Sequence, residues 1–288
     1  MNFKTLILSI LPLFLTLNTL SCEEKNGHYE MNSIVEVGKK INDISKSCGG
    51  TENVLIFLDL DNTLLAMKKP LGSDQWFTWQ AGILKEGKKH NDFPLRVSDN
   101  FSSLLNITKE LFLSTGMRPV EKETLSFVKS LQKSGHKVVI LTSRGGVNAE
   151  ATLRELNKNN LDFTKSSFGK GSPNFFLPYG KTSKKKQREV LFTKGVFMTA
   201  GLHKGEMTQV LMKKFNKTSP CIVHVDDHAK HTTRVQETYK NLKTKAFTFR
   251  YGAEDKLVKE FHKGPKQSVH KDWLSFRKEF HTKKGISL

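Results

Sequence analysis

The feature that most constrains the fold of this 288-residue chain is a set of three largely apolar runs, each followed directly by polar residues. The runs cover residues 54–58, 137–141 and 221–225. The first is continuous, the second begins with Lys137, the third contains His224, and all three are rich in branched residues that favour strands. An apolar run without alternation is expected where a strand is buried on both faces, as in a parallel sheet. These runs therefore predict central strands of a layered α/β structure.

Helical patterns lie between the strands. Residues 33–47 place Ile34, Val37, Ile41 and Ile44 at spacings of three and four, and Gly49 and Gly50 follow as a stop. We also expect helices from Pro119 to Gly135 and over 149–161, 205–215 and 229–242, with further strands at 190–199 and 245–250. The alternation predicts a Rossmann-like, doubly wound parallel sheet with right-handed crossovers.

Two stretches are too long to be ordinary loops of such a fold. Residues 66–117 are predicted to form a small cap inserted after the first strand, and residues 163–189 a loop or small flap. The expected division is a signal peptide (1–21), an N-terminal helical segment (22–52), an α/β core (53–65 and 118–288) and the cap insertion (66–117).

The N-terminus predicts export. Lys4 precedes an apolar run that is too short for a stable membrane span, and small or polar residues follow up to Cys22. We expect a periplasmic or secreted protein with no transmembrane span in the mature chain. A lipid anchor at Cys22 stays open, although Thr19-Leu20-Ser21 is a poor match to the usual pattern before a lipidated cysteine.

The chain is strongly basic, with a formal net charge of +19. Lys4 is the one charged residue in 1–21, so cleavage barely changes this charge. A basic surface attracts anions, which include phosphorylated substrates, nucleic acid and acidic cell surfaces. The lysine-rich run at 184–188 is expected to be a solvated face.

Polar residues at the ends of the predicted strands can carry chemistry. Asp59 and Asp61 follow the first apolar run, and ligands of open α/β sheets bind at such carboxyl ends. The other candidates stand in the same context: Thr142, Ser143 and Arg144 after the second run, Lys204 at the start of a predicted helix, and Asp226 and Asp227 after the third run.

This set resembles the four motifs of the haloacid-dehalogenase superfamily over most of residues 52–250, and it is similar to a group of exported proteins within that superfamily. The resemblance implies a phosphatase in which Asp59 is the nucleophile, Asp61 the general acid/base, Thr142 the phosphate-binding hydroxyl and Lys204 the stabilising cation. It also implies a Mg²⁺ site made by Asp59, the backbone carbonyl of Asp61, and Asp227, with Asp226 holding a metal-bound water. Ser143 and Arg144 would contact the substrate.

The residue types fit this chemistry. A carboxylate can attack a phosphoryl group and form an aspartyl-phosphate, and oxygen ligands suit Mg²⁺. Asp at position 61 favours a phosphatase or a phosphotransferase, because transport ATPases of the superfamily carry Thr there. The leading prediction is a phosphatase acting on a small phosphorylated substrate. A phosphotransferase stays open, as does a basic exported binding protein that contacts nucleic acid or an anionic surface.

Other residues allow two interpretations each. His224, His228 and His231 could hold zinc or be ordinary histidines near the sheet edge, with His224 pointing away from the strand tip. The aromatic residues of 76–79 could form a lid wall or the core of the cap. Arg144 could touch phosphate or bind a local carbonyl.

Cys48 and Cys221 stand just before two strands that are expected to be neighbours. They could therefore form a disulfide at the amino-terminal edge of the sheet, in an oxidising compartment. The alternative is two unpaired cysteines, one of them buried against the N-terminal helix.

Overall fold

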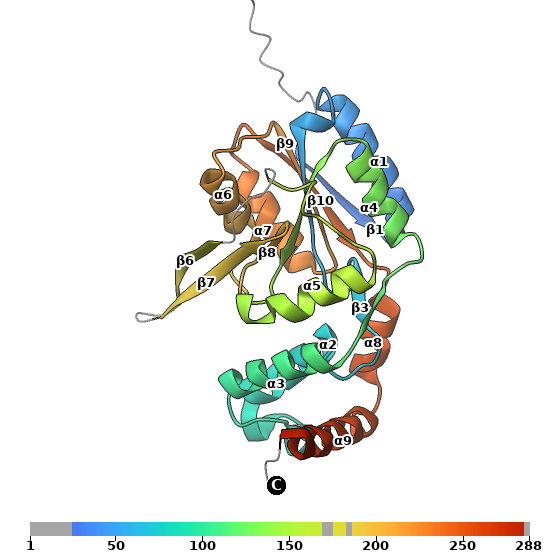
Figure 1. The fold of residues 1–288 in the computed structure, drawn as a ribbon, viewed down its shortest axis with the longest axis vertical. Helices are drawn as coiled ribbons and strands as arrows, with labels where there is room; N and C mark the ends of the chain where they lie inside the picture. Colours follow the sequence, from blue (N-terminus) through green and yellow to red (C-terminus); the bar gives the residue numbers. More distant parts are fainter. Residues whose placement is uncertain (1–24, 169–174, 183–185, 285–288) are drawn as a thin grey trace, which may run out of the picture.

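The computed structural model describes residues 25–168, 175–182 and 186–284, so the predicted signal peptide and Cys22 lie outside the described residues. Its centre is an eight-stranded sheet in the order β1-β10-β9-β2-β5-β8-β7-β6, with helices on both faces (Figure 1). The predicted α/β class is confirmed. The strands are β1 (Gly27–Met31), β2 (Val54–Leu58), β5 (Lys137–Thr142), β6 (Phe175–Thr182), β7 (Lys186–Thr193), β8 (Val196–Met198), β9 (Cys221–Asp226) and β10 (Lys245–Tyr251).

The central strand β2 shows why the sheet is covered on both sides. It lies parallel to β5 on one side and to β9 on the other. Side chains of a strand alternate between faces, so Val54, Ile56 and Leu58 join one apolar core while Leu55 and Phe57 join another. The unbroken apolar run is thus explained by burial against helices on both faces.

The helices divide between these two cores. Buried residues of α1, α4 and α5 belong to the first core, and those of α6 and α7 to the second. None of the helices in the described part of the chain combines the length and the apolar character needed to cross a bilayer. The bounds are α1 (Ile34–Ser47), α4 (Thr124–Lys133), α5 (Ala149–Lys158), α6 (Lys204–Lys214) and α7 (Ala229–Tyr239), with short 3-10 turns at Thr51–Asn53, Gly87–Lys89, Phe93–Leu95 and Gly146–Asn148.

The long insertion forms its own apolar cluster below the sheet in Figure 1. Its two ends pair as a small antiparallel ribbon, β3 (Leu65–Met67) with β4 (Met117–Pro119), and between them lie α2 (Asp74–Glu86) and α3 (Phe101–Ser114). Trp76 and Trp79 are buried in this cluster and Phe77 packs against it, so these three aromatic residues belong to the core of the insertion rather than to a lid wall. The C-terminal helix α9 (Gln267–Lys284), which follows α8 (Asp255–Lys263), contributes Val269 and Trp273 to the same cluster.

The single strand expected at 190–199 is wrong, because the chain reverses there. Thr193 pairs with Val196 across the two-residue turn Lys194-Gly195, and both turn residues have positive φ. Such turns join antiparallel strands. A Cβ at Gly195 would also lie 2.5 Å from the carbonyl oxygen of Phe163. The sheet therefore ends in an antiparallel edge, β8-β7-β6, of which β6 and the first residues of β7 lie in the stretch predicted as a loop or flap (163–189).

Other local predictions also need correction. Pro119 ends β4 instead of starting a helix, since α4 begins only at Thr124. Proline suits the end of an edge strand as well as a first helical turn. The sequence pattern also missed β1, a half-exposed edge strand parallel to β10, and the C-terminal helices α8 and α9.

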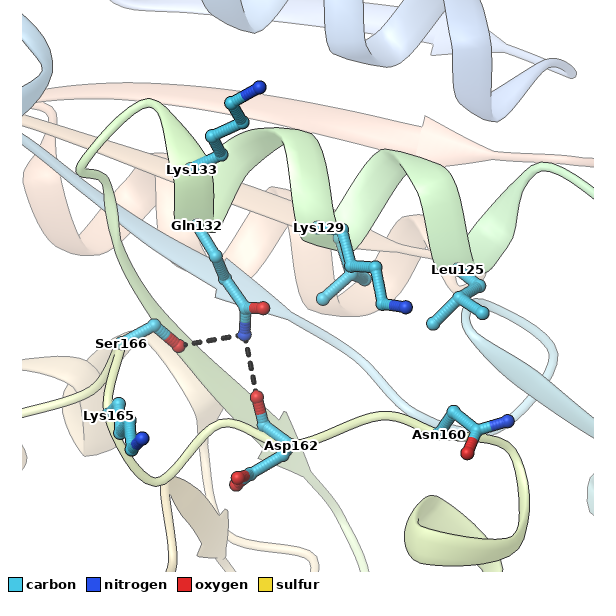
Figure 2. Close-up of a pocket in the computed structure, with 9 residues that line it drawn as sticks. Leu125, Lys129, Gln132, Lys133, Asn160, Asp162, Lys165 and Ser166 are labelled. Atoms are coloured by element: carbon cyan, nitrogen blue, oxygen red, sulfur yellow. Dashed lines mark hydrogen bonds between the residues drawn. The ribbon is translucent and has the colours of Figure 1, made fainter.

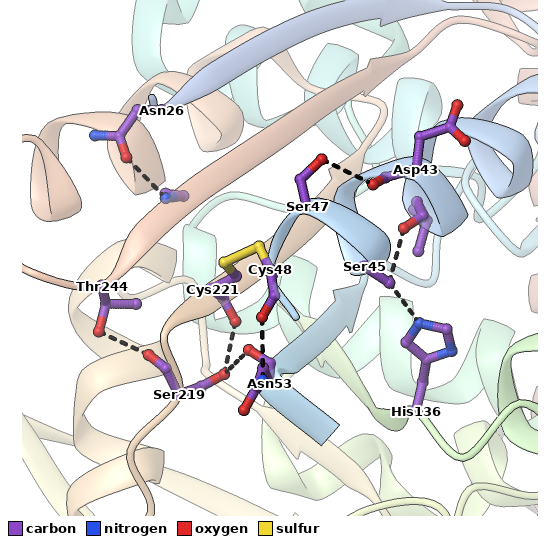
Figure 3. Close-up of a disulfide and its surroundings, with 12 residues drawn as sticks. Asn26, Asp43, Ser45, Ser47, Cys48, Asn53, His136, Ser219, Cys221 and Thr244 are labelled. Atoms are coloured by element: carbon purple, nitrogen blue, oxygen red, sulfur yellow. Dashed lines mark hydrogen bonds between the residues drawn. A yellow bond between two sulfur atoms is a disulfide. The ribbon is translucent and has the colours of Figure 1, made fainter. Parts of the chain in front are cut away.

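The structure joins Cys48 and Cys221 by a disulfide, with 6.5 Å between their Cα atoms (Figure 3). Cys48 follows α1, and Cys221 begins β9 beside the first residue of β2. Both side chains are buried. Of the two alternatives left open by the sequence, the structure therefore has the disulfide, and it lies at the amino-terminal edge of the sheet, opposite the end at which Asp59 follows β2.

Candidate active site at the carboxyl edge of the sheet

Asp59 is fixed at the point where the central strand ends. Its backbone N–H donates to the carbonyl oxygen of Val225 at 2.9 Å, which extends the pairing between β2 and β9 by one residue. The side chain is buried, with 5% of its residue surface exposed. The strand therefore places the Asp59 carboxylate in the protein interior and not in solvent.

Lys204, the first residue of α6, lies between two carboxylates. Its Nζ is 2.5 Å from Asp59 Oδ1 and 2.5 Å from Asp226 Oδ2, and its side chain is 1% exposed. Burial opposes the charge of Lys204, but Asp226 and Asp59 outweigh it and raise its pKa. Burial likewise opposes ionisation of Asp226, yet Lys204 and His224 hold the pKa of Asp226 well below its usual range. Lys204 and Asp226 therefore form a buried ion pair.

This ion pair does not offset the cost of ionising Asp59 and Asp227. Burial raises the pKa of Asp59 to about 7; Lys204 opposes this, and the charges of Asp226 and Asp61 add to it. Burial also raises the pKa of Asp227 well above its usual value, with Asp59 among the contributing charges. One oxygen of Asp227 is buried without a hydrogen-bond partner among the described residues.

These carboxylates fit a hard divalent cation. Asp59, Asp226 and Asp227 each offer an oxygen, and the three oxygens lie within 4.8 Å of one another. A cation would offset the repulsion between Asp59 and Asp227 and would satisfy the unpartnered oxygen. An all-oxygen donor set suits Mg²⁺ better than zinc. The residues that carry the predicted metal site are therefore compatible with it.

The structure does not gather the three histidines into a metal site. Among the described residues, the one group of possible ligands that includes any of them combines His228 with Asp74 and Asp227. His224 was expected to point away from the strand tip, and that was wrong. Its Nε2 lies 3.3 Å from Asp226 Oδ2, because residues two apart on a strand share a face.

Asp61 and Arg144 form a bidentate ion pair. Arg144 Nε donates to Asp61 Oδ2 at 2.9 Å, and Arg144 Nη2 donates to Asp61 Oδ1 at 2.7 Å. Arg144 is buried, whereas the side chain of Asp61 is 20% exposed. The sequence pattern favoured only phosphate or a local carbonyl as partners for this arginine, so the structure adds a third.

Thr142 and Ser143 follow the neighbouring strand. Thr142 is the last residue of β5, and its buried hydroxyl accepts the backbone N–H of Arg144 at 3.2 Å. The hydroxyl of Ser143 is buried and has no hydrogen-bond partner in the described part of the chain. A buried hydroxyl without a partner is unusual, and it suits an oxygen acceptor brought by a ligand.

Sequence reasoning gave no role to two further contacts at this edge. Thr63 Oγ1 lies 3.4 Å from Asp59 Oδ2 and accepts the backbone N–H of Asp227 at 3.1 Å. His228 Nε2 lies 2.9 Å from Asp74 Oδ2 at the start of α2, and this contact raises the pKa of His228 to about 10. The threonine belongs to the Asp-x-Asp-x-Thr pattern, but no local signal marks the contact between His228 and the insertion.

A separate cavity of about 410 Å³ lies between α4 and the loop after α5 (Figure 2). Gln132 Nε2 bridges it by donating to the carbonyl oxygen of Asp162 and to Ser166 Oγ. The backbone of Ser166 pairs with Val138 near the start of β5. This cavity therefore lies toward the amino-terminal edge of the sheet, away from Asp59.

The buried charge of Asp59 predicts a cost in stability. Because the folded-state pKa is raised above the ordinary 3.8, the folded protein binds the proton more tightly, and stability should fall as pH rises from about 4 to 7. In chelator at pH 7.5, Asp59→Asn should raise the melting temperature by roughly 2–4 °C, the equivalent of about 1 kcal/mol in a domain of this size. Thermal melts at pH 5 and 7.5 would check this. A variant that melts lower than the wild type at pH 7.5 would contradict it.

The fold and the site together define an α/β protein with a buried acidic cluster at the carboxyl edge of a mostly parallel sheet. The chain belongs to the family described as "Protein of unknown function (DUF2608)", whose sequence model matches residues 30–283.

A curated relative and several solved structures are similar to this chain. A Chlamydia pneumoniae protein named "Putative outer membrane protein" is 20% identical over 205 residues, which is 71% of each chain. A haloacid dehalogenase-like hydrolase from Streptococcus pneumoniae is 12% identical, with a TM-score of 0.39, and the match covers 72% of this chain and 98% of that one. A class C acid phosphatase from Bacillus anthracis is 14% identical, with a TM-score of 0.33, over 80% and 86% of the two chains. At these scores the similarity does not bear on activity.

Proposed function

We propose that the chain is a Mg²⁺-dependent phosphatase that hydrolyses phosphomonoesters through an aspartyl-phosphate on Asp59. The observation that carries this proposal is the buried Asp59 carboxylate at the tip of β2, with Lys204 at 2.5 Å. In the same cluster lies an Asp227 oxygen that has no hydrogen-bond partner among the described residues. A nucleophilic carboxylate, a fixed cation and spare acidic oxygens are the parts that phosphoryl transfer needs.

Mg²⁺ would be held by Asp59, Asp227 and the backbone carbonyl of Asp61, and it would supply charge neutralisation between the carboxylates and a phosphate. Both oxygens of Asp226 already accept hydrogen bonds from protein groups, one from Lys204 and one from the backbone N–H of His228. Asp226 would therefore act mainly by holding Lys204 in place, and it would reach the metal through a water, in line with the expectation from the sequence.

The first half-reaction transfers the phosphoryl group to Asp59. An Asp59 oxygen attacks phosphorus, the bond to the ester oxygen breaks, and Asp61 gives its proton to that leaving oxygen. Lys204 offsets the charge on the phosphoryl oxygens as the transfer proceeds. The hydroxyls of Thr142 and Ser143, at the end of the neighbouring strand, would donate to those oxygens.

The second half-reaction restores the carboxylate. A water attacks the phosphorus of the aspartyl-phosphate and gives a proton to the now ionised Asp61, and the bond from phosphorus to the Asp59 oxygen breaks. Inorganic phosphate leaves, and Asp61 has regained the proton it gave to the leaving group. The proton and the phosphoryl group are thus both accounted for over one turnover.

The insertion would act as a cap over a small phosphorylated substrate, within the domain division predicted from the sequence. The supporting contact is the one between His228 beside the acidic cluster and Asp74 at the start of α2. It brings the first insertion helix to the edge of the site. The substrates proposed for a site capped in this way are small soluble phosphates.

We also propose that the protein is exported, to the periplasm or the exterior. The buried disulfide between Cys48 and Cys221 supports this, because disulfides persist in oxidising compartments. The Chlamydia pneumoniae relative carries a name that assigns it to an outer membrane. The apolar N-terminus supplies the export signal.

Phosphate release is expected to depend on added Mg²⁺. The test is a screen of phosphorylated compounds with the purified mature protein, in Mg²⁺ and in excess chelator. Because the donor atoms are oxygens, Mg²⁺ or Mn²⁺ should restore activity better than Zn²⁺ after chelation. Full activity in chelator would contradict the metal site. No release from any compound, together with salt-sensitive polyanion binding, would instead favour a binding protein.

A further inference from the structure

All three guanidinium nitrogens of Arg144 donate hydrogen bonds to protein groups. Besides the two bonds to Asp61, Nη1 donates to Thr152 Oγ1 at 3.0 Å and Nη2 to Met117 Sδ at 3.3 Å. The ring of Phe112 lies against the guanidinium, with 3.8 Å from its centroid to Cζ. A planar cation fixed by stacking and by a fork of bonds is preorganised. The guanidinium group of Arg144 is therefore engaged by protein contacts, which argues against a direct role in binding a ligand.

The aromatic platform belongs to the insertion. Phe112 lies near the end of α3, and Arg154 of α5 donates to the carbonyl oxygens of Phe112, Leu113 and Thr115 at that end. These bonds fix the end of α3 relative to the core. The position of Phe112, and through it that of Arg144, is therefore coupled to the seating of the insertion.

The geometry also fixes where the carboxyl group of Asp61 lies. Each of its two oxygens accepts an N–H from Arg144, and the planar fork of a guanidinium group matches a carboxylate at both oxygens. Displacement of the Asp61 side chain would break both bonds. Asp61 must be in place in both half-reactions, first to give a proton to the leaving oxygen and then to receive one from water.

We propose that Arg144 is a positioning residue that fixes the carboxyl group of Asp61 for its proton transfers, and that Phe112 supports Arg144 from the insertion. This inference rests on the proposed phosphatase function. With a leaving group that needs little protonation, loss of this positioning should slow the second half-reaction, whereas loss of direct phosphate binding would slow the first. In the step concerned, a water proton moves to Asp61 as the phosphorus–oxygen bond to Asp59 breaks.

The test separates the two half-reactions with p-nitrophenyl phosphate, whose leaving group needs little protonation. Arg144→Lys keeps the charge but loses the fork, and Arg144→Gln loses both. Positioned bases contribute about 10²–10⁴-fold, so with Mg²⁺ we expect kcat to fall roughly 10–100-fold in both variants. Because the phospho-enzyme then accumulates, KM should fall with kcat and leave kcat/KM nearly unchanged. The burst of p-nitrophenol should keep its rate, and its amplitude should stand out more clearly because the steady-state release that follows is slower.

The burst amplitude counts folded, competent sites, so poor folding of a variant cannot imitate the result. Phe112→Leu should lower kcat several-fold with the same burst. Phe77→Leu is the matched control: Phe77 contacts Phe101 within the insertion cluster, and the same change there should leave kcat and the burst as in the wild type. Equal losses from Phe112→Leu and Phe77→Leu would overturn the role of the stacking contact.

A slower burst and a higher KM in the Arg144 variants would overturn the inference and assign Arg144 to phosphate binding. Unchanged kcat in both variants would overturn it as well. These outcomes leave the proposed function standing, because the wild type still releases phosphate. A wild type with no burst and no release on any phosphomonoester would overturn the proposed function first, and the inference with it.

Discussion

Asp59→Asn is expected to abolish phosphate release, with a loss of about 10⁴-fold or more, because the amide cannot replace the carboxylate as a nucleophile. Asn has nearly the same shape, and Lys204 keeps its contact with Asp226, so the variant should fold. Phosphate release with Mg²⁺ at saturating substrate is the measurement. The matched control is Asp43→Asn, which removes an exposed carboxylate on α1 and should leave turnover unchanged.

The paired variant Asp61→Asn should behave differently, because attack by Asp59 remains possible. With a good leaving group, the aspartyl-phosphate should form and persist, since no base receives the proton of water. Intact-mass spectrometry would detect the added phosphoryl group in Asp61→Asn and not in Asp59→Asn. Wild-type turnover in Asp59→Asn would show that the assignment of the nucleophile is wrong.

Loss of the disulfide is expected to cause the largest change in stability. The bond links residues 173 positions apart and ties the end of α1 to the start of β9. A native disulfide of this kind stabilises a fold by about 2–4 kcal/mol, which corresponds to a fall of about 4–16 °C in melting temperature for a domain of this size. Thermal melts with and without a reducing agent would measure it.

Two comparisons make this test specific. The double variant with Cys48→Ala and Cys221→Ala should melt at about the temperature of the reduced wild type or slightly lower, because it also leaves two small cavities. Turnover at moderate temperature should not change, since the bond lies at the edge of the sheet opposite Asp59. Equal melting temperatures under oxidising and reducing conditions would contradict the prediction.

The sequence alone was sufficient where the information is local. The apolar runs before Asp59, Thr142 and Asp226 identified three central strands, because a strand buried on both faces needs apolar residues at successive positions. The same runs placed the candidate residues at one edge, since parallel strands end on the same side of a sheet. A disulfide between the two cysteines could be proposed because their strands were expected to be neighbours, but the alternative of two unpaired cysteines was decided only by the structure.

Local patterns failed where two interpretations share one pattern. Pro119 suits both a first helical turn and the end of a short strand, and only its pairing with β3 decides between them. The apolar residues of 190–199 suit one strand or two, and the Lys194-Gly195 turn is decided by its pairing. The edge strand β1 lacks an apolar run because one of its faces remains partly exposed.

The tertiary structure alone decided how the charges at the site are shared. Lys204 lies 145 residues after Asp59 in the sequence, and Arg144 lies 83 residues after Asp61. No periodicity or spacing records which carboxylate meets which cation over such separations. That choice depends on the chain connections that place β9 and β5 on either side of β2, and on the packing of Phe112 of α3 against Arg144. The sequence therefore determined which chemical groups gather at the carboxyl edge of the sheet, and the packing of distant segments determined which of them are paired and which remain available for a ligand.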